Sequence, residues 1–166
     1  MKAAKKRAIV IVLLAAVLLA ASWLFYARPV TILQLHPMLS LEQCTEIRGY
    51  YKIGAQEELS EFTVDRDSGG FQALWELFFG QTYRRSLRDL LPRGTRIHAA
   101  QPEEFQWEVY FCFEEIGFPD GSSGSGAMLR FQNWYGELDI VFDGETHSYR
   151  TGGQETWAAE VLALIQ

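Results

Sequence analysis

Cysteine and histidine are both scarce in this chain of 166 residues, which contains two cysteines and three histidines. Cys44 and Cys112 allow a single pairing, and two alternatives stay open: a disulfide that closes a long loop, or a buried thiol at Cys112. His36, His98 and His147 are too far apart in the sequence to suggest a metal-binding set. Walker patterns and dinucleotide fingerprints are also absent, so the sequence favours a binding module over an enzyme.

Positive charge is scarce after residue 27. That part of the chain holds 11 of the 15 basic residues and all 21 acidic ones, which gives a net charge of −10. A domain that binds nucleic acid needs a basic face, and so does one that lies flat on anionic lipid. We therefore expect the domain neither to bind nucleic acid nor to lie flat on anionic lipid.

Charge of either sign is missing from 8–27, a run of 20 largely apolar residues. As a helix this run is roughly 30 Å long, the thickness of the hydrocarbon core of a bilayer. Four basic residues precede it within 1–7, and only Arg28 follows closely. This asymmetry predicts a single-pass signal-anchor in the cell membrane, with 1–7 in the cytoplasm and the rest outside. A signal peptide cleaved after Ser22 is the alternative.

The remaining 139 residues are enough for one domain. We expect a juxtamembrane segment at 28–44, with a first strand at 30–35, and an extracytoplasmic domain at 45–166. Alternating apolar residues predict strands at 46–53, 58–64 and 105–113, with Gly49 as a bulge or a close-approach site. A helical apolar stripe begins at Phe71, and a second one covers 155–165.

Two turns organise the end of the chain. Residues 120–126 (DGSSGSG) predict a long hairpin loop. Asp143-Gly144 predicts a type I′ turn that sets Phe142 opposite Glu145, Ile140 opposite His147 and Leu138 opposite Tyr149. The predicted fold class is α+β: an N-terminal transmembrane helix, then an antiparallel sheet of five to seven strands packed against two helices.

Several features resemble small, uncharacterised membrane-anchored extracytoplasmic domains of Gram-positive bacteria. They are the Tyr50-Tyr51 strand, the Phe71/Leu74/Trp75 helix, the segment 83–87 (YRRSL) and the terminal meander with its helix. The resemblance covers most of 45–166. It implies no assigned activity and no functional residue.

One candidate site is a calcium loop. Asp65, Asp67 and Glu76 occupy positions 1, 3 and 12 of the helix-loop-helix calcium motif, and Gly70 occupies position 6. Positions 5 and 9 lack the usual oxygen donors, and a capped turn is the favoured alternative. Calcium is the one cofactor that the sequence suggests.

A second candidate is a run of arginines within 13 residues, which suits a carboxylate or phosphate ligand. Its members are Arg84, Arg85, Arg88, Arg93 and Arg96. Pairing with the many acidic residues of the chain is the alternative.

A third candidate is an aromatic face of the sheet, formed by Tyr50, Tyr51, Tyr110, Trp134 and Tyr135. It predicts a module that binds an envelope protein or a wall polymer, unless these rings fill the core. A cell-wall hydrolase that uses acidic residues, with Glu114-Glu115 or Glu103-Glu104 as candidates, and a calcium-stabilised envelope domain are the alternatives.

Overall fold

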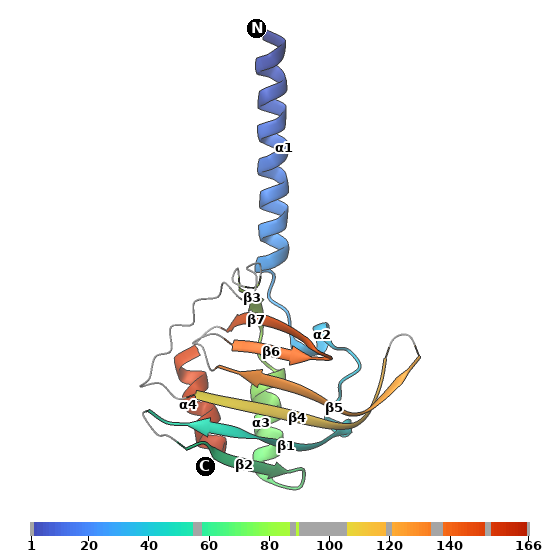
Figure 1. Cartoon of the computed structure of the whole chain (residues 1–166), viewed down its shortest axis with the longest axis vertical. Helices are drawn as coiled ribbons and strands as arrows, with labels where there is room; N and C mark the ends of the chain where they lie inside the picture. The colour runs from blue at the N-terminus through green and yellow to red at the C-terminus, as the bar shows by residue number, and fades with distance from the viewer. Residues whose placement is uncertain are drawn as a thin grey trace.

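The computed structural model describes residues 2–54, 58–86, 89, 106–118, 121–133, 138–151 and 154–165. A long N-terminal helix, α1 (Lys2–Ala27), projects from a domain built of a sheet and shorter helices (Figure 1). The sheet has seven antiparallel strands in the order β2-β1-β4-β5-β6-β7-β3. This architecture confirms the predicted α+β class. The strand number equals the largest value in the predicted range of five to seven.

The strands are β1 (Cys44–Lys52), β2 (Ser60–Asp65), β3 (Tyr83–Arg85), β4 (Gln106–Gly117), β5 (Ser123–Gln132), β6 (Leu138–Phe142) and β7 (Glu145–Thr151). The other helices are α2 (Ile32–Leu35), a 3-10 turn η1 (Leu41–Gln43), α3 (Gly69–Phe79) and α4 (Gln154–Ile165). The two helices predicted from apolar stripes are α3 and α4, which pack against each other and against β2.

The core lies between α3 and one face of the sheet. Phe78 of α3 lies edge-to-face against Phe111 of β4 and Phe131 of β5, with ring centroids 5.2 and 4.7 Å apart. Every second side chain of β4 from Trp107 to Phe113 is buried on this side. The period of two seen in the sequence therefore marks the core face, and we call the opposite side of the sheet the outer face.

Gly49 is a close-approach site, one of the two predicted alternatives. A Cβ at this position would overlap the carbonyl oxygen of Glu108 and lie 2.9 Å from the ring of Phe62. The register shift of β1 against β4 occurs between Cys44 and Glu46, so the bulge alternative is wrong for Gly49.

The Asp143-Gly144 turn has the predicted conformation and register. Asp143 and Gly144 have φ values of 49° and 77°, both in the left-handed region that a type I′ turn requires. Phe142 pairs with Glu145, Ile140 with His147 and Leu138 with Tyr149. This register places His147 on the core face of the sheet, opposite the buried Ile140.

The prediction of a strand at 30–35 is wrong. Thr31 caps α2 instead: its side chain accepts a hydrogen bond from Gln34 N, and the Gln34 side chain accepts one from Thr31 N. Only Val30 pairs with the sheet, through two backbone hydrogen bonds with Tyr83 of 2.7 and 2.9 Å. This reciprocal capping box outweighs the β-branched composition of the segment.

The predicted loop at 120–126 is also too long. Ser123, Gly124 and Ser125 pair with Gly117, Ile116 and Glu115 as a continuation of β5. Backbone groups supply the hydrogen bonds of a strand pair, so glycine and serine extend the hairpin although they carry no apolar pattern.

Cys44 and Cys112 are both free thiols. Cys44 belongs to the buried core, whereas Cys112 alternates with the buried Phe111 and Phe113 and so lies on the outer face. Because the two side chains lie on opposite faces of the sheet, the disulfide alternative does not fit this fold.

In α1, the large apolar side chains described between Ile9 and Leu24 are 54–72% exposed. Among the residues that the structure describes, no helix combines the length and the apolarity needed to cross a membrane.

Candidate functional site

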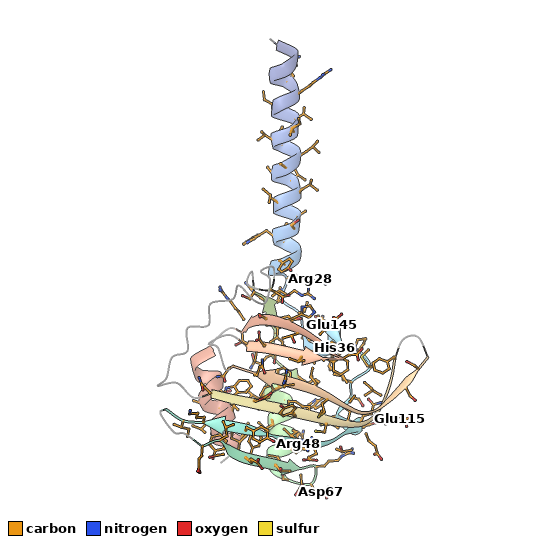
Figure 2. The ribbon with its side chains drawn as sticks, in the orientation of Figure 1. Arg28, His36, Arg48, Asp67, Glu115 and Glu145 are labelled. Atoms are coloured by element: carbon orange, nitrogen blue, oxygen red, sulfur yellow. The ribbon has the colours of Figure 1, made fainter. Side chains whose placement is uncertain are left out.

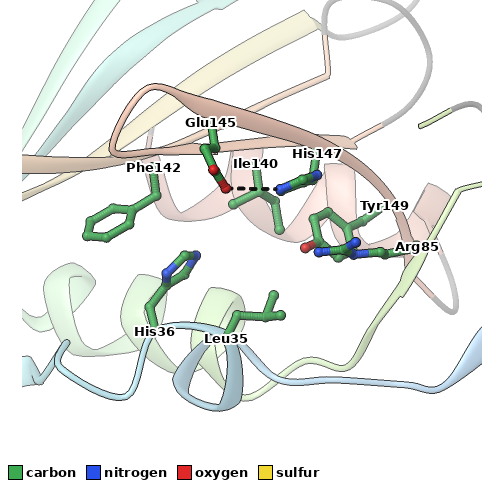
Figure 3. A pocket seen from close by; sticks show the side chains of 8 residues that line it. All are labelled: Leu35, His36, Arg85, Ile140, Phe142, Glu145, His147 and Tyr149. Carbon is green, nitrogen blue, oxygen red and sulfur yellow. Dashed lines mark ion pairs between the residues drawn. The ribbon is translucent and has the colours of Figure 1, made fainter. Parts of the chain in front are cut away.

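A cavity of about 160 Å³ lies near the end of the domain from which α1 leaves (Figure 2). Its lining comes from the α2 segment, β3, β6 and β7 (Figure 3), and consists of Leu35, His36, Arg85, Ile140, Phe142, Glu145, His147 and Tyr149. Leu35 and His36 lie across the cavity from the residues of β6 and β7. Nitrogen-bearing side chains from three chain segments thus line one small cavity with a partly apolar wall.

Asp89 holds the ring of His147 in place. The Nδ1 atom of His147 lies 3.0 Å from Oδ2 of Asp89, and Ser148 N donates to Oδ1 of the same carboxylate at 3.4 Å. The Asp89 side chain is 7% exposed, so it is a buried support. An ionised carboxylate only accepts hydrogen bonds, which places a proton on Nδ1 and turns Nε2 away from Asp89.

Glu145 is the other partner of His147. Its Oε2 lies 3.5 Å from Nε2 of His147, and its side chain is 80% exposed at the rim of the cavity. A carboxylate this exposed forms a weak ion pair, because water screens it and its side chain stays mobile.

His36 lines the side of the cavity opposite β6 and β7. Its ring centroid lies 4.5 Å from that of Phe142. Burial lowers the pKa of His36, the charge of His147 lowers it further, and Glu145 raises it. Burial therefore favours the uncharged ring of His36.

Arg85 links the cavity to α1. It hydrogen-bonds to the side chain of Tyr149, and its guanidinium carbon lies 6.0 Å from the ring centroid of Tyr26 near the end of α1. Burial, in turn, raises the pKa of Tyr149. Arg84, the residue before Arg85 in β3, is exposed.

Of the predicted arginine group, the structure thus assigns Arg85 to the cavity and leaves Arg84 in solvent. Arg88, Arg93 and Arg96 lie outside the described residues. His147 appears in the sequence as a sheet histidine opposite Ile140. Its partner Asp89 is 58 residues away, which no spacing motif could reveal.

The predicted aromatic face is divided between the two sides of the sheet. Tyr50 and Tyr110 meet on the outer face with ring centroids 6.4 Å apart. Tyr51 points the other way, toward Phe62. Trp134 and Tyr135 lie outside the described residues.

Charged side chains surround this tyrosine pair. Tyr110 Oη donates to Oε1 of Glu108 at 2.7 Å, and a guanidinium nitrogen of Arg130 lies 3.1 Å from the same oxygen. Arg48 contacts the sulfur of Met128 at 3.7 Å. We call these six residues, Arg48, Tyr50, Glu108, Tyr110, Met128 and Arg130, the outer-face patch.

The three predicted calcium ligands do not form a metal-binding group in the structure. Asp65, Asp67 and Glu76 are all exposed, and Glu76 accepts a hydrogen bond from Gln72 at 2.9 Å. Across the described part of the chain, no three His, Cys, Asp or Glu side chains are grouped to hold a metal. Asp67 lies at the end of the domain far from α1 (Figure 2).

Of the carboxylates of the hydrolase alternative, the structure describes Glu114 and Glu115. Glu114 and Glu115 line an open groove with Glu42 at the far ends of β4 and β5. Glu103 and Glu104 lie outside the described residues.

Compared with family models, curated proteins and solved structures, the chain matches none of them.

Proposed function

We propose that this chain is a membrane-anchored module that uses 8–27 as its anchor and binds an envelope protein or wall polymer outside the cytoplasm. The observation that carries the proposal is the exposure of α1. Its large apolar side chains between Ile9 and Leu24 find no cover in the domain. An apolar surface of this extent marks a membrane or a protein contact.

The uncharged sequence of 8–27 and the charges that flank it support a membrane as the cover. The uncharged run 8–27 lies within α1 and is roughly 30 Å long as a helix. The basic residues ahead of it, against Arg28 alone behind it, favour a cytoplasmic N-terminus. On this arrangement the domain lies outside the cytoplasm.

The outer-face patch supports a binding role for the domain. α3 and α4 pack on the core side, and the patch offers tyrosine, arginine and methionine side chains, the types enriched in protein interfaces. The hydrogen bonds between Tyr110, Glu108 and Arg130 hold these groups in fixed positions before any partner arrives. Such preorganisation reduces the entropy lost on binding.

The test is photo-crosslinking in intact cells that make the protein. A benzophenone amino acid replaces Tyr50 in one variant and Leu33 in the control, since Leu33 is an exposed residue of α2 away from the patch. We expect a discrete adduct from position 50 and none from position 33. No adduct at position 50, or the same adducts at both positions, would contradict the binding role.

A further inference from the structure

Arg85 and two histidines line the cavity beside α1, although the domain as a whole is acidic. Arg85 offers a planar fork of N–H groups that matches phosphate oxygens, and His36 and His147 present ring nitrogens from two other segments. Drug-sized and cofactor sites occupy about 300 Å³ or more, so a cavity of about 160 Å³ suits a single small group. We infer that this cavity binds the phosphate group of a phosphate monoester.

Nitrogen-bearing side chains on three chain segments favour phosphate over carboxylate. Arg85 comes from β3, His147 from β7 and His36 from the residue after α2. A terminal phosphate has three oxygens that point in different directions, whereas a carboxylate has two in one plane. The buried Asp89 keeps the His147 ring oriented, so the ring does not need to be ordered on binding. With a proton on each ring nitrogen, Nε2 donates to a phosphate oxygen while Nδ1 stays bonded to Asp89.

Glu145 would compete with a phosphate for His147. Its contact with Nε2 of His147, at 3.5 Å, occupies the nitrogen that the phosphate would use. Because Glu145 is largely exposed, it can turn into solvent when the phosphate enters. Removing its charge should therefore strengthen binding.

The position of Arg85 near Tyr26 suggests two sources for the phosphate group: a soluble monoester, or the head group of an anionic lipid at the surface next to α1. The net charge of −10 after residue 27 opposes non-specific attraction of either one. Binding would thus depend on the cavity itself.

The experiment follows the ring signals of His36 and His147 by NMR in the full chain. One arm titrates inorganic phosphate into the protein in micelles of an uncharged detergent. The other compares nanodiscs of phosphatidylcholine with and without phosphatidic acid. We expect both ring signals to shift saturably in at least one arm: a shift with inorganic phosphate alone identifies a soluble monoester, and a shift with phosphatidic acid identifies the head group.

Three variants separate the cavity from general charge. Arg85→Gln should weaken binding about tenfold, since it removes the charged fork. Arg84→Gln removes the same charge from the exposed neighbour and should leave binding unchanged. Glu145→Gln, at an exposed side chain that does not endanger folding, should strengthen binding about threefold. No saturable shift in either arm, equal losses for Arg84→Gln and Arg85→Gln, or weaker binding by Glu145→Gln would overturn the inference.

Discussion

Among the described strand glycines, Gly49 has the closest neighbouring atoms. Its Cα faces the carbonyl of Glu108 and the ring of Phe62, and backbone atoms cannot move aside for a methyl group. Gly49→Ala should therefore lower the free energy of unfolding by about 3 kcal/mol or more. Urea unfolding followed by tryptophan fluorescence measures this loss.

Gly117 provides the matched control, since it is also a strand glycine but has open space where a Cβ would lie. Gly117→Ala should change the stability by less than about 1 kcal/mol. Equal effects of the two substitutions would show that the tight contact at Gly49 is not what limits the sheet.

His36 makes stability depend on pH. Burial, and then the charge of His147, lower its pKa in the folded state below the value of 6.5. The unfolded chain thus binds more protons near that pH, so the free energy of unfolding falls as the pH drops through 6.5 toward the folded pKa.

His36→Phe keeps a ring against Phe142 and removes the titration. We expect its free energy of unfolding to fall less than that of the wild type between about pH 7.5 and pH 5.5. Urea unfolding at both pH values measures the difference. Identical losses in the two proteins would show that His36 does not contribute to the pH dependence.

Among the elements, the β6–β7 hairpin shows most directly how a local pattern fixes a register. Gly144 has a φ of 77°, where a side chain clashes with its own backbone. Gly144→Ala should destabilise the domain by about 1–2 kcal/mol, read from its thermal midpoint. Asp143→Gly accepts the left-handed φ of 49° and should change stability by less than about 0.5 kcal/mol. An unchanged midpoint for Gly144→Ala would contradict the strained turn.

The elements that the sequence predicts correctly are those with a strong local signal. The alternation around Phe111 and the apolar stripe from Phe71 gave β4 and α3, because burial on one face imposes the period of the element. The segment 30–35 failed because its β-branched residues favour a strand, whereas a capping box of two side chains decides the structure.

The cavity could be predicted only in part. Arg85 was one of five arginines in the predicted run, and the hairpin register placed His147 on the core face of the sheet. The pairing of His147 with Asp89, and the approach of His36 to Phe142, depend on how distant segments of the chain pack against the β6–β7 hairpin. Such tertiary contacts leave no periodic signal in a single sequence.

At the scale of the whole molecule, the connection between α1 and the sheet is short and hydrogen-bonded. Val30 pairs with Tyr83 on the edge strand three residues after α1 ends, and Arg85 of the same strand lies beside Tyr26. The cavity end of the domain is therefore held next to the end of the helix (Figure 2). If α1 is in a bilayer, the cavity lies close to the lipid surface.

The proposed topology is tested most directly by external cleavage at an introduced protease site. One variant carries a specific site in the exposed turn at Gly121-Ser122, and a control carries the same site ahead of Lys2. The protease is added to cells whose wall has been opened. We predict cleavage at the turn and none ahead of Lys2. An uncut turn together with a cut N-terminus, or protection of both sites, would contradict a domain held outside the membrane by α1.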